Sequence, residues 1–264
     1  MSTFLFDEIV FGPVQSRMLG VSLGINLLPV DCKYCNFDCI YCECGRNTGG
    51  KGQYSLPSRE DVYAALERKL VSMQERETQY GAPQLPDAIT FAGNGEPTLH
   101  PEFAGIIDDT VALRNRYAPQ SKISVLTNAA MLHRQEIVNA LQKTDMPILK
   151  LDSAIDATFQ LVNQPVKNIS VSQLIQQLQS FGKQCIVQTM FVQGSYRGQA
   201  VDNTTPEELA AWKRAILDIQ PAQVMIYTIA RAAPTATLNK VPGDKLREIA
   251  ALLSEYEIRV QISE

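Results

Sequence analysis

Five of the chain's six cysteines lie in one run of thirteen positions, from Cys32 to Cys44. Thiols crowded this closely indicate a metal site. Cys35, Cys39 and Cys42 are spaced C-x3-C-x2-C, so one short loop can place three thiolates around one face of an iron–sulfur cluster. Ferredoxin-type clusters give every iron a thiolate ligand, whereas this spacing leaves the fourth iron open. The pattern therefore predicts a reactive cluster, since an open iron can bind a substrate.

Other uses of these cysteines stay open. A zinc site could pair Cys32 with Cys35 and Cys39 with Cys42, but only three residues separate the two pairs, where zinc ribbons place roughly 15–20. A fully ligated cluster could use Cys32 or Cys44 as its fourth ligand. Disulfides are disfavoured because we see no apolar N-terminal signal segment, and a cytosolic chain keeps its thiols reduced. We expect a cytoplasmic protein.

Length and composition fit one enzyme domain. The chain has 264 residues, of which 45% are hydrophobic and 20% charged, and no stretch approaches the ~18 apolar residues of a membrane helix. We expect a single domain with an N-terminal extension (1–20), a barrel (21–230) and a C-terminal helix and strand (231–264). The net charge is −4 with no lysine or arginine block, unlike a dedicated nucleic-acid binder, although a local basic patch could still accept tRNA.

Apolar runs alternate with amphipathic stretches, which predicts βα units and a parallel sheet. The alternation suits an α/β partial (β/α)6 barrel or a doubly wound open sheet, and either would place chemistry at the carboxyl ends of the strands. The expected strands are Val21–Leu28, Ala88–Ala92, Ile123–Leu126, Ile148–Leu151, Cys185–Met190 and Val224–Tyr227, with a strand-like Ile258–Ile262 at the end. The expected helices are Arg59–Met73, Glu102–Arg114, Arg134–Leu141, Val171–Phe181, Pro206–Leu217 and Asp244–Ser254. We expect Gly49–Gly52 and Gln193–Asn203 to be flexible loops.

A glycine-rich turn, G-N-G-E-P, follows the second expected strand. Gly93 and Gly95 let the backbone approach a ligand closely, and Pro97 fixes the exit of the turn. An ordinary βα turn would need no ligand, so the turn alone is a weak signal. Its position two elements after the cysteine run makes a binding role the better interpretation.

The cysteine spacing, with Tyr41 before the last cysteine, and the G-N-G-E-P turn together resemble the radical S-adenosylmethionine superfamily. The resemblance implies a partial (β/α)6 barrel with a [4Fe-4S] cluster on Cys35, Cys39 and Cys42. It also implies that S-adenosylmethionine chelates the open iron and is reductively cleaved to methionine and a 5′-deoxyadenosyl radical. That radical would abstract hydrogen from a substrate.

The resemblance also implies a set of site residues at strand ends. Lys150 and Asp152 share one face of the fourth strand, and a buried unpaired charge is costly, so we expect a pair with a catalytic role; a purely structural salt bridge would fit as well. Threonine and asparagine are common in turns and helix caps, so Thr127 and Asn128 could equally have only a structural role. The expected cofactor-binding residues are Tyr41, Gly93, Asn94, Gly95, Glu96, Thr127, Asn128, Asp152, Ser153, Gln188 and Tyr227.

The segment from Phe11 to Leu27 and the run Gly95–Pro101 give a narrower resemblance, to compact radical enzymes grouped with wybutosine tRNA-modification proteins. The tRNA reaction does not follow, because we see no obvious extra domain or basic extension. Arg17 and Arg231 flank the predicted barrel and could bind an anionic group, or be solvated.

We expect as partners an unidentified substrate, which could be a small molecule, tRNA or a protein, and a reductant such as flavodoxin or ferredoxin, with no membrane. A glycyl-radical enzyme activase is an alternative. A non-catalytic iron–sulfur or zinc module is a second. An auxiliary cluster on Cys32, Cys44 and Cys185 is less favoured because their spacing is irregular.

Overall fold

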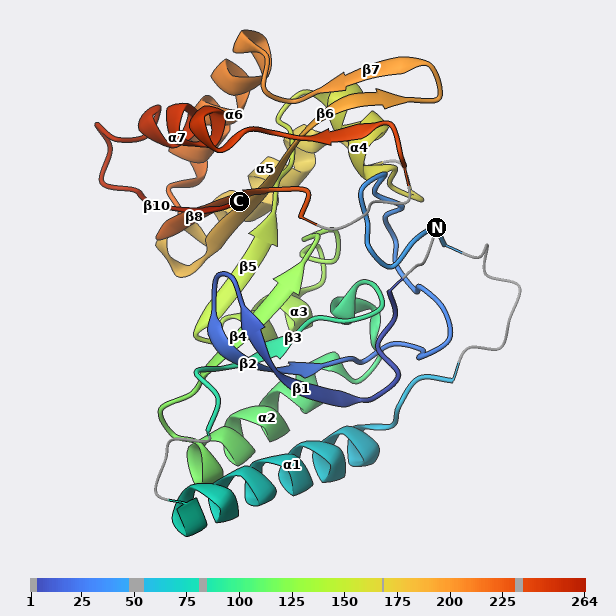
Figure 1. The fold of residues 1–264 in the computed structure, drawn as a ribbon, viewed down its shortest axis with the longest axis vertical. Helices are drawn as coiled ribbons and strands as arrows, with labels where there is room; N and C mark the ends of the chain where they lie inside the picture. Colours follow the sequence, from blue (N-terminus) through green and yellow to red (C-terminus); the bar gives the residue numbers. More distant parts are fainter. Residues whose placement is uncertain (1–3, 48–54, 81–84, 168, 231–234) are drawn as a thin grey trace.

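The computed structural model describes residues 4–47, 55–80, 85–167, 169–230 and 235–264. In these residues the strands form one curled half-barrel sheet in the order β1-β2-β3-β4-β5-β6-β8-β10, with β7 and β9 paired to β6 (Figure 1). The strands are β1 Val10–Ser16, β2 Gly20–Ile25, β3 Ala88–Phe91, β4 Lys122–Thr127, β5 Met146–Lys150, β6 Ile186–Tyr196, β7 Gln199–Asp202, β8 Gln223–Thr228, β9 Leu238–Lys240 and β10 Arg259–Ser263. The expected partial barrel is confirmed.

The strands from β2 to β10 along this order pair in parallel, and they include all six strands of the predicted barrel. The last predicted strand also joins the sheet, as β10 beside β8. Strand β2 ends before the predicted Leu28 because the Asn26 side chain turns the backbone. Its amide donates to the Leu28 carbonyl and its oxygen accepts from the Leu28 N–H, which directs the next residues out of the sheet.

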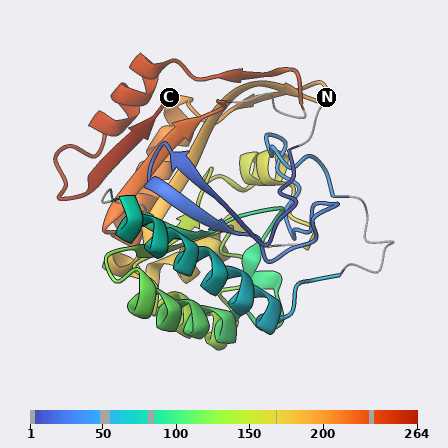
Figure 2. The same cartoon turned by 60° about the horizontal axis from the view of Figure 1, so that its bottom comes forward.

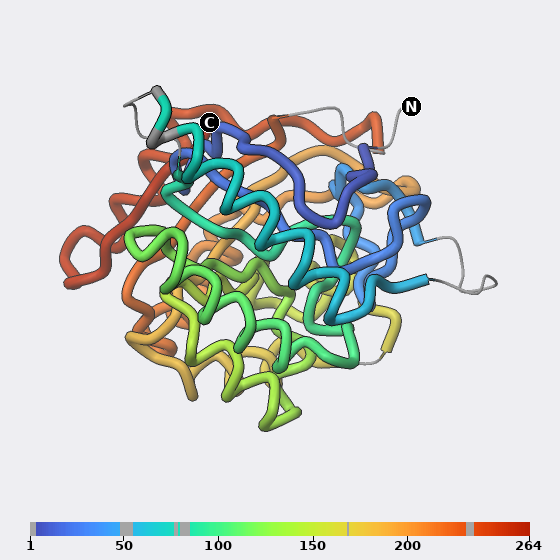
Figure 3. Tube along the Cα trace, turned by 90° about the horizontal axis from the view of Figure 1, so that it is seen from below, coloured from blue at the N-terminus to red at the C-terminus, as the bar shows by residue number. Residues whose placement is uncertain are grey.

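Helices α1 and α2 lie side by side on the outer face of the sheet (Figures 1 and 3). Helix α5 shows why such segments are helical: Val171, Leu174 and Leu178 are buried at helical spacing, and Ser170 with Gln173 forms a capping box. The helices are α1 Arg59–Tyr80, α2 Phe103–Tyr117, α3 Gln135–Leu141, α4 Asp156–Asn163, α5 Val171–Gln179, α6 Pro206–Ile219 and α7 Gly243–Ala251. Among the described residues, none of the helices has the length and apolar character needed to span a membrane.

Several segments differ from the sequence-based expectation, among them β1 and β9, which were not among the expected strands. The predicted loop Gln193–Asn203 is wrong, because β6 continues to Tyr196 and forms a hairpin with β7. Helix α4 was not among the expected helices. The predicted loop Gly49–Gly52 lies outside the described residues.

The turn between β1 and β2 crosses to the other edge of the curled sheet. The Gln261 side-chain amide on β10 donates to the Met18 carbonyl at 3.2 Å, and the Arg17 guanidinium donates to the Glu264 carbonyl at 3.4 Å. Figure 2 shows this blue hairpin between the outer helices and the orange and red strands. The concave face of the sheet is therefore partly enclosed, and it holds the cavity described below.

We expect Leu178→Ala to lower the free energy of unfolding by about 2–5 kcal/mol, because it leaves a cavity under α5 where Leu178 is fully buried. Urea unfolding followed by the fluorescence of Trp212, the chain's single tryptophan, measures this change. Gln179→Ala, on the exposed side of the same helix, should change it by less than about 0.5 kcal/mol. Equal effects of the two substitutions would contradict the packing of α5.

Candidate functional site

The cysteine loop follows β2 and is held against the glycine-rich turn after β3. The Tyr34 N–H donates to the Asn94 carbonyl at 2.8 Å, and the Glu96 N–H donates to the Tyr34 carbonyl at 3.1 Å. Gly95 has a φ of +146°, and a Cβ there would lie 1.9 Å from the Tyr34 carbonyl oxygen. The second glycine of the turn is therefore required by the close approach of two backbones.

The other side of the loop is held by α4. The Asp38 N–H donates to the Asn163 carbonyl at 3.1 Å, and the Ile40 N–H donates to the Val162 carbonyl at 2.9 Å. The end of this helix thereby fixes the backbone that carries Cys39. The loop is thus attached to two βα units far apart in the sequence.

The three predicted cluster ligands line one cavity of about 260 Å³ on the concave side of the sheet. Its remaining walls come from the strand ends and the glycine turn, which brings most of the predicted site residues together. Those lining it besides Cys35, Cys39 and Cys42 are Tyr41, Gly93, Gly95, Glu96, Thr127, Asn128, Lys150, Gln188 and Tyr227. Arg17 also lines the cavity, whereas Arg231 lies outside the described residues.

The three thiols have different electrostatic surroundings. Burial raises the pKa of Cys35 well above its ordinary value and that of Cys39 to about 11. A hydrogen bond with the Cys44 thiol lowers the pKa of Cys42 to about 6, helped by the Lys33 ammonium and opposed by burial. Lys33 is itself buried, with its ammonium 3.1 Å from both an Asp38 carboxylate oxygen and the Gly45 carbonyl. The buried Lys33 ammonium can therefore offset negative charge on the thiolates.

This donor set fits an iron–sulfur cluster. Three thiols from one loop face a common cavity, and each would bind a different iron, so they must surround a volume rather than converge on a point. Among the described residues, no three or more His, Cys, Asp or Glu side chains are grouped to hold a single metal ion. The walls opposite the thiols carry polar groups that could bind a ligand of the fourth iron.

Glu96 braces the glycine-rich turn from within. Its carboxylate accepts hydrogen bonds from the Thr98 N–H at 3.1 Å, the Thr98 hydroxyl at 2.5 Å, the Thr127 hydroxyl at 2.6 Å and the Asn128 N–H at 2.7 Å. Burial raises the pKa of Glu96, and these four donors oppose that shift. The carboxylate thus ties the turn after β3 to the end of β4.

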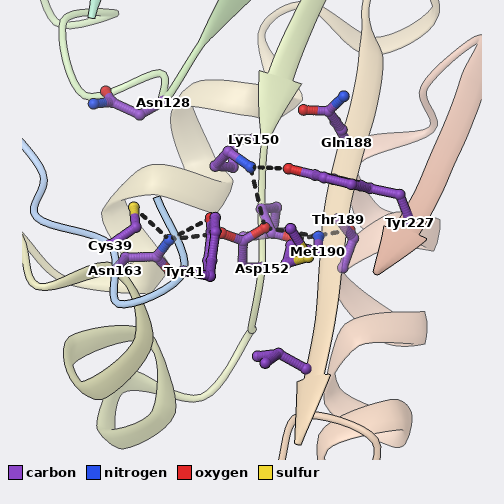
Figure 4. A network of polar contacts seen from close by, with 12 residues as sticks. Cys39, Tyr41, Asn128, Lys150, Asp152, Asn163, Gln188, Thr189, Met190 and Tyr227 are labelled. Carbon is purple, nitrogen blue, oxygen red and sulfur yellow. Dashed lines mark hydrogen bonds and ion pairs between the residues drawn. The ribbon is translucent and has the colours of Figure 1, made fainter. Parts of the chain in front are cut away.

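Asp152 is the centre of a buried polar network below the cavity (Figure 4). Its carboxylate accepts from the Tyr41 hydroxyl, from the Asn163 side-chain amide at 2.6 Å and from the Met190 N–H at 2.9 Å. Burial raises the pKa of Tyr41 well above its ordinary value, so its phenol stays neutral and can donate. The network joins the cysteine loop to α4 and β6.

Lys150 lies between Asp152 and the cavity. Its ammonium donates to the Tyr227 hydroxyl at 2.7 Å, lies 3.6 Å from Asp152, and sits over the rings of Tyr41 and Tyr227 at 5.3 and 5.2 Å. Burial would lower the pKa of Lys150, but Asp152 and Tyr227 together raise it above its ordinary value. The predicted pair of Lys150 and Asp152 is present, and Lys150 is a permanent cation on the cavity wall.

Three predicted site residues do not line the cavity. Asn94 is fully buried and its amide group bonds to both backbone groups of Phe6 and to the Pro29 carbonyl, so it anchors the N-terminal segment. Ser153 donates to Glu208 at 2.7 Å. Asp152 lies behind Tyr41 and Lys150. Their placement favours support of the site over direct contact with a ligand.

The sequence-based interpretation missed Lys33 and Asn163. Lys33 stood inside the cysteine run without any pattern that marks a buried cation. Asn163 ends a helix that was not predicted, and its contact with Cys39 spans 124 positions of the chain. No local spacing could have revealed that contact.

No family model matches this chain. It is 25% identical over 258 residues to the UPF0026 protein MJ1312 of Methanocaldococcus jannaschii, covering 94% of this chain and 71% of that protein. It is 30% identical over 191 residues to a UPF0026 protein of Synechocystis, covering 70% of this chain and 64% of the relative. The chain thus spans less than two thirds of the length of the Synechocystis protein.

Solved structures resemble the chain over most of its length. A radical SAM methyltransferase from Sphaerobacter thermophilus has a TM-score of 0.65 at 12% identity, covering 92% of this chain and 65% of that one. The enzyme anSMEcpe with bound AdoMet scores 0.57 at 14% identity, covering 91% and 63%. Archaeal TYW1 scores 0.52 at 12% identity, covering 89% and 71%. The chain therefore has the partial-barrel fold of the radical S-adenosylmethionine enzymes.

Proposed function

We propose that the chain is a radical S-adenosylmethionine enzyme. The observation that carries the proposal is the placement of Cys35, Cys39 and Cys42 on one cavity, beside the glycine-rich turn and at the carboxyl ends of parallel strands. These thiolates would hold a [4Fe-4S] cluster and leave one iron facing the cavity. Together with S-adenosylmethionine, the bound cluster would supply a reductive cleavage to methionine and a 5′-deoxyadenosyl radical that abstracts hydrogen from a substrate.

The protein's own groups supply the binding surface for that cofactor. Gly93 and Gly95 bring backbone to the cavity wall without side chains in the way, so carbonyls of the turn could accept from the ammonium of S-adenosylmethionine. The Thr127 hydroxyl and the Asn128 side chain line the wall from the end of β4. Gln188 and Tyr227 line the opposite wall, from β6 and β8. These groups can bind the polar parts of the nucleoside.

Lys150 would hold an acceptor group of the cofactor or substrate in this cavity. Its ammonium has three N–H donors. The Tyr227 hydroxyl accepts from one, and Asp152 lies close enough to pair with the ammonium from a second side. Asp152 fixes the position of the ammonium and keeps it charged. A reductant such as flavodoxin or ferredoxin would deliver the electron, and the substrate, whether a small molecule, tRNA or a protein, would donate the hydrogen.

Cys35→Ala, Cys39→Ala and Cys42→Ala should each abolish cluster assembly, because each removes the only thiolate for one iron. The measurement is anaerobic reconstitution with iron and sulfide, then dithionite reduction with S-adenosylmethionine and chromatography for 5′-deoxyadenosine. We expect about four irons per wild-type chain and a product that all three variants lose.

Cys185→Ala is the matched control, since this thiol is buried immediately before β6 and does not line the cavity. It should keep both iron and product. Cys44→Ala distinguishes the proposal from a non-catalytic iron–sulfur module that uses Cys44 as its fourth ligand. Loss of the cluster in that variant would indicate a fully ligated, non-catalytic site. A reduced wild-type cluster that forms no 5′-deoxyadenosine would also count against the proposal.

Glu96→Ala should weaken S-adenosylmethionine binding, because the turn that presents Gly93 and Gly95 loses its internal brace. We expect the dissociation constant to rise about tenfold, or ~1.4 kcal/mol, and the free energy of unfolding to fall by about 1.5–3 kcal/mol. Calorimetric titration and urea unfolding measure the two effects. Glu102→Ala, at an exposed glutamate nearby, should change neither; unchanged binding in Glu96→Ala would refute the brace.

A further inference from the structure

Asn163 is a buried amide beside a predicted cluster ligand. It is the last residue of α4, is 1% exposed, and does not line the cavity. Its side-chain nitrogen lies 3.5 Å from the Cys39 sulfur, 2.6 Å from an Asp152 carboxylate oxygen and 3.4 Å from the Tyr41 oxygen. Figure 4 shows this nitrogen between the thiol and the carboxylate.

The orientation of this amide is fixed by its neighbours. A carboxylate and a thiolate are both acceptors, so the amide must point its N–H groups at Asp152 and Cys39. The reverse orientation would place a carbonyl oxygen against the Asp152 carboxylate at a distance of 2.6 Å. Asp152 itself is held by Tyr41 and the Met190 N–H, so it acts as a fixed anchor for Asn163.

Burying the Asn163 side chain has a cost in folding free energy. The side-chain oxygen (Oδ1) of Asn163 is buried and has no hydrogen-bond partner among the described residues. A buried polar atom without a partner is uncommon in native structures and requires an explanation. An apolar side chain of similar volume would avoid this cost, and Asp152 would keep its other donors. Such a replacement would remove the donation to Asp152, which has other donors, and the donation to the Cys39 sulfur.

A second side-chain amide lies near the predicted ligand Cys35, at a longer distance from the sulfur. The Asn128 side-chain nitrogen lies 3.8 Å from the Cys35 sulfur but donates to the Asn36 side-chain oxygen at 2.6 Å. Cys35 also accepts from the Phe37 N–H at 3.4 Å. Cys39 accepts a side-chain hydrogen bond from Asn163 at 3.5 Å, so the effect of Asn163 should be the easier one to isolate.

We infer that Asn163 is a positioning residue that raises the reduction potential of the cluster by donating a hydrogen bond to the Cys39 thiolate. The inference rests on the proposed function. Reduction adds negative charge to a cluster and its thiolates, and a donor at the sulfur stabilises that charge. Asp152 aims the donor, so the same carboxylate that fixes Lys150 on the cavity wall also orients the amide at the cluster.

The test compares reconstituted wild type with Asn163→Leu, in an EPR-monitored redox titration without S-adenosylmethionine. We expect the variant to bind the same amount of iron and to be reduced at a lower potential. At a fixed potential the ratio of reduced to oxidised cluster should fall about tenfold, which is ~59 mV for a one-electron couple. An unshifted midpoint at full iron content would overturn the inference.

Asn163→Asp is the second variant, in case Asn163→Leu fails to fold or to bind iron. It is nearly isosteric, and the new carboxyl beside Asp152 would share one proton with that carboxylate, which leaves no donor at the Cys39 sulfur. It should shift the midpoint in the same direction, and a midpoint at or above that of wild type would overturn the inference. Thr189→Val is the matched control, because Thr189 is equally buried beside the network but bonds to Leu151 and Trp212. Its midpoint should equal that of wild type, and an equal shift there would refute a specific role for Asn163.

These outcomes separate the two proposals. A wild-type chain that takes up no cluster would refute the proposed function before the potential is measured. A wild-type cluster with unshifted variants would leave the proposed function intact and remove the role of Asn163.

Discussion

The site depends on how closely the cysteine loop lies against the turn after β3. Gly95 allows the Tyr34 carbonyl to approach its backbone, and two backbone hydrogen bonds then lock the segments together. The three thiols could not otherwise hold a common orientation, because a loop of this length has little regular structure of its own. The α4 end supplies the second attachment. A flexible run of cysteines thus becomes one wall of a cavity.

Buried charge decides the rest of the arrangement. Asp152, Glu96, Lys33 and Lys150 all lie at the cavity or beneath it, and each is engaged by opposite charge or by hydrogen-bond donors and acceptors. An unpaired charge there would be expensive, so these side chains hold one another in place. The consequence is a rigid wall with cations and thiols at fixed positions, which is what binding a charged cofactor requires.

The fold alone leaves the reaction open. Partial barrels of this kind occur in a methyltransferase, in the AdoMet-bound anSMEcpe and in archaeal TYW1, and their identity to this chain is 12–14%. A shared fold does not establish a shared reaction or substrate. In this chain Lys150, Gln188 and Tyr227 line the cavity together with Arg17, which lies on the hairpin that crosses the sheet.

The sequence by itself determined the features that are local in the chain. The spacing of Cys35, Cys39 and Cys42 and the periodicity of the strands and most helices follow from neighbouring residues, and they predicted βα units around a cysteine loop. That periodicity suited a doubly wound sheet as well, so the partial barrel and most of the cavity's residues were predicted from the resemblance to radical S-adenosylmethionine enzymes. Tertiary structure alone decided that Asn94 turns toward Phe6, that Gln193–Asn203 pairs as a hairpin, and that Asn163 reaches Cys39. The reason is physical: hydrogen bonds between distant segments depend on how whole βα units pack, and no local pattern of residues encodes that packing.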